Sequence, residues 1–444
     1  MTTVLFCFGA FLLCFLAGNR SLKTGLLSVV AVGYAYGILR ANFPDIWTYL
    51  MFDAAVIGLY VSQLWRPLPY EQRVRLHDLQ LWIAALIAWP VLLFIMFPGA
   101  NPLVELVGLR ANVFFLPFLL LGGRLNYDDI ADIALALAAF NLAVVGVGVV
   151  EFFVGIEPFY PVNEVTEIIY KSKDLVGRTA YRIPATFSSA HAFAGTMVMT
   201  VPLLVGAWSQ THREKWHGAL LGAGIIVTLT GVFMAAARVH MITAAILVAI
   251  VTVTGRLGGK QWLPLAVAIA VVGYVVAGDE RLQRFTTLQD TGFLAERWEG
   301  SVNDGFFDIV GEYPLGNGLA GGGTSVPYFL RGDWQPGPVM ENEYARIVLE
   351  LGLPGLALWM LFVLWVLTRW PSRLRDSWLL GRRLGWVTWA VAFFSGLLGM
   401  GLLNSVPQTI LMLTAMGWYA ATRKPQPVLA RRMTPRVQAG AVAR

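Results

Sequence analysis

The sequence predicts an all-α polytopic membrane protein with about 12–13 transmembrane helices. Of its 444 residues, 57% are hydrophobic and only 14% are charged, whereas an ordinary soluble domain carries about 25% charged residues. Apolar stretches long enough to cross a hydrocarbon core of about 30 Å recur along the whole chain, and lysine and arginine gather in alternate loops. A water-soluble enzyme is excluded, because a chain of this size cannot bury so much apolar surface.

Thirteen apolar stretches are predicted to span the membrane. The second is the shortest, and an error in the count near the N-terminus would change only that end. No cleaved signal peptide is expected, because residues 1–18 lack a basic segment and a small-residue cleavage site. In chain order the predicted spans are 2–18, 25–39, 47–64, 80–97, 104–122, 130–154, 187–208, 219–236, 239–254, 262–277, 346–368, 384–401 and 406–421.

The positive charges predict the orientation of these spans. Alternate short loops and the C-terminal segment hold most of the 33 lysines and arginines, and such loops lie on the cytoplasmic side. The N-terminus is therefore predicted outside and the C-terminus inside. The net charge of +6 is explained by insertion and by contact with anionic membrane lipids, and no nucleic-acid partner is expected.

Two outward segments, 155–186 and 278–345, are too long to be simple connections. In the second, Leu294, Trp298, Val302, Phe306 and Ile309 recur at helical spacing, which predicts an amphipathic helix on the outer face. The predicted organisation is a transmembrane helix bundle at 1–277 with the outer loop 155–186, a loop domain at 278–345, further transmembrane helices at 346–421, and a basic cytoplasmic tail at 422–444.

Charged residues at membrane depth are costly and are candidates for function. Arg110 lies in or beside the fifth span, where it is either functional or part of a structural ion pair, with Glu105 as the expected partner. Asp53 and Glu151 lie within predicted spans. Each is either functional or a carboxylate that helps to pack helices.

Three arginines on the outer side predict a site for an anion. Arg238 follows three alanines where two spans meet with almost no loop, and Arg182 and Arg297 lie in the two long outer segments. Arginines with few lysines beside them suit bidentate binding of a phosphate or diphosphate. The alternatives are an Arg238 that snorkels to the lipid headgroups and surface salt bridges for the other two.

A general base is harder to assign. His191 and His240 are the two histidines predicted outside. Glu341 and Glu343 precede the eleventh span, where burial would suit a carboxylate to proton abstraction, but both could instead cap that helix. No Cys and His cluster has the spacing of a metal site, so no metal and no cofactor are predicted. Gly316 and Gly318 belong to a glycine-rich turn, which either lets the backbone approach a sugar or phosphate or simply turns sharply.

Motifs in the second half of the chain resemble those of the O-antigen ligase/polymerase family. They are Glu296-Arg297-Trp298, residues 313–318 (Tyr-Pro-Leu-Gly-Asn-Gly), residues 341–344 (Glu-Asn-Glu-Tyr) and residues 350–355 (Glu-Leu-Gly-Leu-Pro-Gly). Residues 182–187 and 191–195 resemble an upstream outer motif, and Arg238 matches an arginine that follows small residues. The resemblance covers about 180–360 in motifs and the whole chain in layout.

This resemblance implies a GT-C-like glycosyltransferase of the bacterial inner membrane, with its active site facing the periplasm and with no metal. Its substrates would be a glycan on undecaprenyl diphosphate and a sugar acceptor, with a chain-length regulator as a partner left open. The resemblance assigns the diphosphate to Arg238 and Arg297, and less directly to Arg182.

Ligases of the family carry a histidine before the asparagine at the start of the late span. Here that position holds Glu341, followed by Asn342, which favours a polymerase and lets His191 share the role of base. A ligase, a lipid-linked sugar transporter and a non-catalytic envelope scaffold are the alternatives.

Overall fold

The computed structural model describes most of the chain. The described residues are 2–97, 101–171, 181–210, 215–254, 298–323, 326–333, 342–371, 376–397 and 405–421, with the single positions 292, 295, 399 and 403. The predicted span 262–277, the tail 422–444 and most of the first half of the loop domain lie outside them.

Within this part of the chain the regular structure is helical, and no strand is present. The elements are α1 (Thr2–Arg20), α2 (Leu22–Asn42), α3 (Ile46–Leu64), α4 (Tyr70–Met96), α5 (Pro102–Val113), α6 (Phe118–Arg124), α7 (Tyr127–Val154), α8 (Glu167–Lys171), α9 (Ala190–Gln210), α10 (Lys215–Met234), α11 (Arg238–Thr254), η3 (Glu299–Phe307), α14 (Asp308–Glu312), η4 (Tyr328–Asp333), α15 (Glu343–Leu367), α16 (Leu379–Ser395) and α17 (Gln408–Ala420).

The chain is an all-α, multi-pass membrane protein, as predicted. Eight helical segments of the described residues are long and apolar enough to cross a membrane. Every predicted span other than 262–277 coincides with a helix, or with the pair α5 and α6 for 104–122. α11, α16 and α17 contain only 17, 17 and 13 residues, so length alone does not make them spans. α3 is also not among the eight, so four of the predicted spans stay predictions in the described residues.

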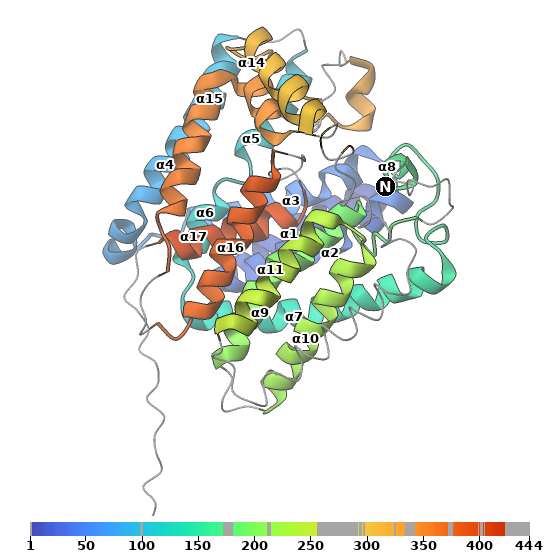
Figure 1. Ribbon diagram of the computed structural model, residues 1–444, viewed down its shortest axis with the longest axis vertical. Helices are drawn as coiled ribbons and strands as arrows, with labels where there is room; N and C mark the ends of the chain where they lie inside the picture. Colours follow the sequence, from blue (N-terminus) through green and yellow to red (C-terminus); the bar gives the residue numbers. More distant parts are fainter. Residues whose placement is uncertain are drawn as a thin grey trace, which may run out of the picture.

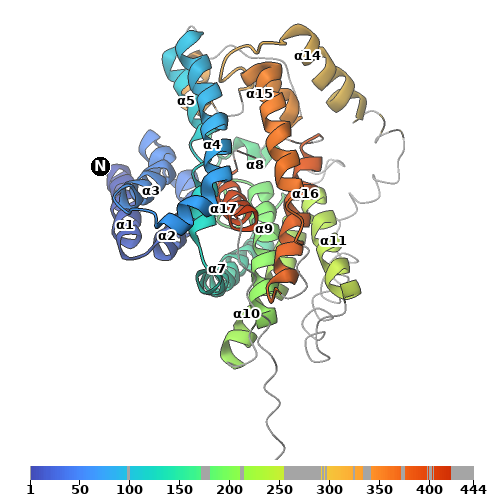
Figure 2. The ribbon, with the colours of Figure 1, turned by 90° about the vertical axis from the view of Figure 1, so that its left-hand side faces the viewer.

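The helices do not form one parallel bundle. α4 and α15 stand side by side in both views, whereas α7 lies across them, seen along its length in Figure 1 and nearly end-on in Figure 2. α9 is the central helix, because 94% of the residues in its most apolar stretch are buried inside the protein. It packs against α7, α10, α11, α16 and α17.

Hydrogen bonds and ion pairs near the helix ends show which ends lie together on the same side of the protein. We call the end at which α9, α11 and α15 begin the outer end, following the predicted orientation, and the opposite end the inner end. At the outer end Asn42 Nδ2 donates to the Phe159 carbonyl and the Tyr344 hydroxyl donates to the Phe393 carbonyl. At the inner end Gln210 bonds to the Ser377 carbonyl and Arg369 pairs with Asp78. Segments that the charge pattern assigns to one side therefore contact each other.

The segment after η3 is fixed on the outer end of α15. η3 and α14 make residues 299–312 of the predicted amphipathic segment helical. Ile309 is buried against Val348 and Leu349, but Trp298, which was expected on the same apolar face, is exposed. Figures 1 and 2 show α14 above the first turns of α15. Leu294 lies outside the described residues, and Val302 is not part of this buried cluster.

α15 is kinked at Gly352, where φ is 70° and ψ is 178°. The glycine-rich turn fits against this kink, because Asn317 N donates to the Leu349 carbonyl at 2.6 Å and Leu353 N donates to the Pro314 carbonyl at 2.8 Å. The kink exposes backbone groups that a straight helix would use internally. The turn satisfies them and is thereby held at the outer end.

Candidate functional site

The structure describes eight of the ten residues predicted for the site. Arg297 and Glu341 lie outside the described residues, so their roles stay predictions. The eight that are described are Arg110, Arg182, His191, Arg238, His240, Gly316, Gly318 and Asn342.

Arg182 and His191 contact each other at the entrance to α9. Arg182 Nη1 lies 2.9 Å from His191 Nε2. Arg182 belongs to an irregular segment, 181–189, and His191 lies in the first turn of α9. The side chain of His191 is exposed, whereas Arg182 is half-buried. The resemblance placed these residues in one motif, and the structure brings them into contact.

The segment that carries Arg182 is held by buried hydrogen bonds. Ala185 has a φ of 51°, and the buried Glu151 carboxylate accepts its N–H at 2.9 Å. The Tyr160 hydroxyl donates to the carbonyls of Ala185 and Phe187. Glu151 therefore has a structural role, which was one of its two predicted roles, and it fixes the backbone beside Arg182.

His240 brings the start of α11 to the same place. Its ring centroid lies 6.3 Å from that of His191, and Arg238 is the first residue of α11. Three buried alanines, Ala235, Ala236 and Ala237, form the tight connection from α10. Small side chains here let α11 approach α9. We call Arg182, His191, Arg238 and His240 the basic cluster.

The basic cluster has unused hydrogen-bonding capacity. Arg182 Nε and His240 Nδ1 are buried and have no hydrogen-bond partner among the described residues. Buried polar atoms are normally satisfied, so unpaired ones mark a place for a water molecule or a polar ligand. A ligand with phosphate oxygens would satisfy the guanidinium directly.

Arg110 forms a structural ion pair with Asp53. Arg110 Nε lies 2.9 Å from Asp53 Oδ2, and Nη2 contacts Oδ1. The expected pairing with Glu105 was wrong, because Glu105 turns to the glycine-rich turn and accepts the N–H of Leu319 at 3.2 Å. Both carboxylates thus join separate segments at the outer end.

Asn342 begins α15 and caps it. Its Oδ1 accepts the N–H groups of Tyr344 at 2.9 Å and Ala345 at 3.2 Å, a geometry that satisfies donors left open at a helix start. Glu343, which was the other described candidate for stabilising this helix start, lies in the first turn of α15. Its buried carboxylate instead receives two hydrogen bonds from Arg346.

A buried charge network that the sequence analysis missed lies along the first two turns of α15. Arg346 is 0% exposed and bonds to Glu343 at 2.7 Å and to Glu350 at 2.5 Å. Asn112 Nδ2 of α5 also donates to Glu350, at 2.8 Å. The signal was present in the sequence, because Glu343, Arg346 and Glu350 stand at i, i+3 and i+7 on one face of an apolar helix.

Gly316 and Gly318 are explained by close packing within the protein. Their φ angles are 88° and 96°, which favours glycine. A Cβ at Gly316 would lie 3.0 Å from the Gly352 nitrogen, and one at Gly318 would lie 2.7 Å from Glu105 Oε1. The sharp-turn interpretation therefore accounts for both glycines.

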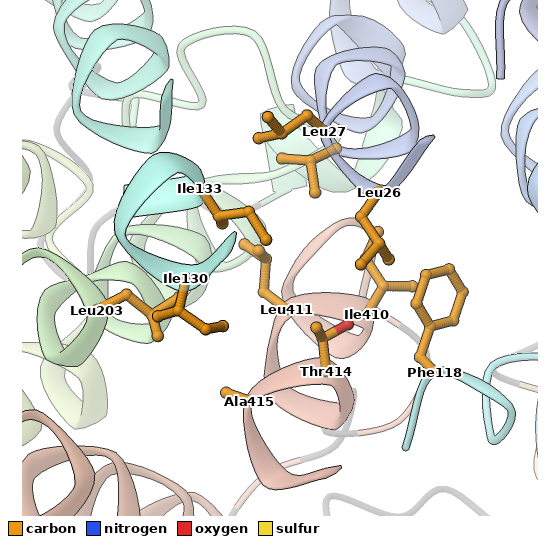
Figure 3. A pocket seen from close by; sticks show the side chains of 11 residues that line it. Leu26, Leu27, Phe118, Ile130, Ile133, Leu203, Ile410, Leu411, Thr414 and Ala415 are labelled. Atoms are coloured by element: carbon orange, nitrogen blue, oxygen red, sulfur yellow. The ribbon is translucent and has the colours of Figure 1, made fainter. Parts of the chain in front are cut away.

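An apolar cavity of about 20 Å³ lies between α2, α6, α7, α9 and α17 (Figure 3). Ligand pockets are typically ~300–1,000 Å³, so this cavity is too small for a substrate, and its walls carry no charged group. Its lining side chains are Leu26, Leu27, Val30, Phe118, Ile130, Ile133, Leu203, Ile410, Leu411, Thr414 and Ala415.

Comparison with known proteins assigns no family. No protein-family model matches the chain, and no curated protein matches it in sequence. In the part of the chain that the structure describes, no group of three or more His, Cys, Asp or Glu side chains is placed to hold a metal ion. The candidate site therefore rests on the basic cluster.

Proposed function

We propose that the chain is a glycosyltransferase of the bacterial inner membrane that polymerises glycan units carried on undecaprenyl diphosphate. In this proposal the fold is GT-C-like, the 278–345 loop domain is periplasmic, and the active site faces the periplasm. The observation that carries it is the meeting of Arg182 with His191 and of His191 with His240, beside Arg238. Such a group of cationic and imidazole side chains suits an anionic lipid diphosphate and a proton transfer.

The leaving group requires stabilisation of negative charge. The acceptor hydroxyl oxygen attacks the anomeric carbon, the bond from that carbon to the diphosphate oxygen breaks, and undecaprenyl diphosphate leaves with the electron pair. Guanidinium groups positioned beforehand stabilise the charge as it develops. Arg182 and Arg238 take this role, with Arg297 proposed as a third arginine.

The hydroxyl proton goes to a base. A guanidinium can only donate, so Nε2 of His191 accepts in its contact with Arg182, and the imidazole is neutral with its proton on Nδ1. A bound diphosphate would draw Arg182 to its oxygens and free Nε2 for the proton. Glu341, next to Asn342, is the second candidate base.

The positions of the buried charges bear on the alternatives. A sugar transporter would place ionisable groups near the bilayer midplane. In the described helices, the buried Asp53, Glu151 and Glu350 lie in the eight residues nearest the outer helix end, which is about 12 Å at 1.5 Å per residue. This favours chemistry at the membrane boundary. A ligase would share that chemistry and differ in its acceptor, such as lipid A-core.

The test is a deletion strain complemented with wild type, Arg238→Ala, Arg238→Lys or the inner-end control Arg73→Ala. The length and the carrier of the glycan are measured in each strain. We expect single repeat units to accumulate on the lipid carrier unless wild type or Arg73→Ala is present. Arg238→Ala should lower turnover by about 100-fold or more, and Arg238→Lys should rescue little because it loses the bidentate geometry.

Long chains left on the carrier, with a bare final acceptor, would identify a ligase. Near-normal chain length with Arg238→Ala would refute the proposed role of the basic cluster. Full rescue by Arg238→Lys would instead indicate a scaffold, in which the charge alone suffices.

A further inference from the structure

Another arginine at the outer end lies among aromatic rings and pairs with no carboxylate of the described residues. Arg40, in the last turn of α2, places its guanidinium carbon 5.0 Å from the ring centroid of Tyr49 and 5.9 Å from that of Tyr36. Its side chain is half-buried, and its Nε is buried without a hydrogen-bond partner among the described residues. None of the ion pairs in the described part of the chain includes Arg40.

Arg40 forms no ion pair with the described carboxylates around it. Asp53 pairs with Arg110, and Asp45 and Glu164 act electrostatically with Arg40 on the hydroxyl group of Tyr328, but neither forms an ion pair with Arg40. The buried Nε therefore keeps an open donor, which an anion would satisfy.

Aromatic side chains from the predicted outer loop domain complete the surroundings. Phe329 of η4 packs edge-on against Tyr49, with ring centroids 5.5 Å apart at 90°, and Tyr328 packs against Phe329 at 5.3 Å. Phe329 remains 36% exposed. Aromatic rings offer apolar faces on which the C–H groups of a sugar can pack, and the Tyr49 hydroxyl offers a hydrogen bond, whereas the Tyr36 hydroxyl donates to the Tyr49 carbonyl.

Arg40 does not simply extend towards the lipid headgroups. Phe43 and Trp47, in the connection from α2 to α3 and the first turn of α3, are exposed and suit the membrane interface. Arg40 instead lies against Tyr36 of its own helix and Tyr49 of α3. Its guanidinium is therefore held inside a frame of protein side chains.

We propose that Arg40, Tyr36, Tyr49 and Phe329 form a second anion site, which binds a sugar phosphate or diphosphate. The guanidinium takes the phosphate oxygens, and the rings of Tyr49 and Phe329 contact the attached sugar. This site uses α2, α3 and η4, whereas the basic cluster uses the 181–189 segment, α9 and α11. The inference therefore goes beyond the proposed function and does not depend on it.

The experiment measures how many farnesyl diphosphate molecules bind to the full-length protein in phosphatidylcholine nanodiscs, by native mass spectrometry, with dissociation constants from titration. We expect two probes on wild type, one on Arg40→Gln, one on Arg182→Gln and two on the control Arg73→Gln. Arg40→Lys should keep the second probe at about tenfold weaker affinity, because lysine retains charge but not bidentate geometry. Thermal unfolding of each variant checks that it is folded.

A second arm uses phosphatidylglycerol nanodiscs without the probe and counts retained phosphatidylglycerol. If Arg40→Gln binds one farnesyl diphosphate fewer than wild type, the site exists and its ligand is a diphosphate. If Arg40→Gln loses only a bound phosphatidylglycerol, the site exists and its ligand is a phospholipid headgroup. Unchanged stoichiometry and affinity of both ligands in Arg40→Gln would overturn the inference. If Arg182→Gln still bound two probes, the basic cluster would not be a diphosphate site. The result for Arg40→Gln would still decide whether the Arg40 site exists.

Discussion

The pairing of Arg346 with two carboxylates shows how a full charge is kept inside an apolar helix. Its guanidinium is entirely buried, and it bonds to Glu343 and Glu350. Removal of one partner from a buried ion pair typically costs about 3–5 kcal/mol, because the remaining charge is uncompensated. Asn112 shares Glu350, so the network also joins α5 to α15.

Arg346→Met should therefore destabilise the protein by about 3–5 kcal/mol. The measurement is unfolding in detergent by urea or heat, compared with the exposed Arg73→Met control, which should stay within about 0.5 kcal/mol. The triple variant Glu343→Gln, Arg346→Met, Glu350→Gln should recover much of the loss, since neutral partners leave no unpaired charge. Wild-type stability in Arg346→Met alone would contradict the network's role.

Arg182 and His191 should act as one unit in the proposed reaction. His191→Ala should lower turnover by about 10²–10⁴-fold if the imidazole is the base, and Arg182→Ala by about 10²–10³-fold. Because the two groups touch, the double variant should be close to the worse single variant.

Rates of glycan extension by purified enzyme give this double-mutant cycle. His77→Ala, an exposed histidine at the inner end, should leave the rate unchanged. If the fold-loss in rate of the double variant equalled the product of the two single fold-losses, the side chains would act independently.

Residue partners were predictable only where they lie on one element. The i, i+3 and i+7 spacing on α15 contains Arg346 and both its carboxylates, so this network could have been found. The partner of Arg110 could not, because Asp53 comes from α3 and the sequence offered Glu105 on the same helix. Contacts between helices depend on packing angles that hydrophobicity does not encode.

At the scale of an element, the kink in α15 depends on one backbone conformation. Gly352 has a φ of 70° and a ψ of 178°, a region that is essentially restricted to glycine and costs other residues about 1–3 kcal/mol. A Cβ there would also lie 2.7 Å from the Leu315 carbonyl carbon. The glycine-rich turn and the helix thus fix each other.

Gly352→Ala should lower stability by about 1–3 kcal/mol or more and loosen the glycine-rich turn. Hydrogen exchange of residues 313–323 reports the loosening, and thermal unfolding reports the stability. Gly311→Ala is the matched control, because a Cβ at that position of α14 meets nothing within 4 Å and alanine favours a helix. Equal unfolding temperatures for the two variants would contradict this account of the kink.

Helix positions followed from hydropathy, but irregularities inside helices did not. The predicted spans coincide with the described helices because about 20 apolar residues satisfy both the membrane and backbone hydrogen bonding. The break between α5 and α6, the interrupted α15 and the crossing of α7 arise from tertiary packing. Gly352 and Pro354 indicate a possible interruption, yet only the docked turn shows why the helix bends there.

At the scale of the whole molecule, the basic cluster and most buried carboxylates of the described residues gather at one end, with Asp376 at the inner end as the exception. Asp53, Glu151 and Glu350 anchor segments at the outer end, and Arg182 lies beside one of these anchored segments.

Between the two ends the buried polar groups of the described helices are uncharged, as in the hydrogen bonds of Asn141 with Tyr34, Thr200 and Thr228. This suits a protein whose charged groups meet the membrane boundary. The charge pattern alone predicts whether the outer end faces the periplasm or the cytoplasm. The proposed function depends on this orientation.

Single cysteines test this orientation. Cys7 and Cys14 are first replaced by serine and alanine, and cysteine is then placed at Val162 or Leu315 of the outer end or at Trp216 of the inner end. All three positions are highly exposed, at 78%, 79% and 74%, so differences in labelling report the side and not burial. Because arginine and lysine are retained on the cytoplasmic side, a membrane-impermeant maleimide should label the first two in cells with a permeabilised outer membrane. It should label Trp216→Cys only after the inner membrane is lysed. The opposite pattern would place Arg182 and His191 in the cytoplasm, where a periplasmic glycosyltransferase could not use them, and the proposed function would fail even if both residues proved essential.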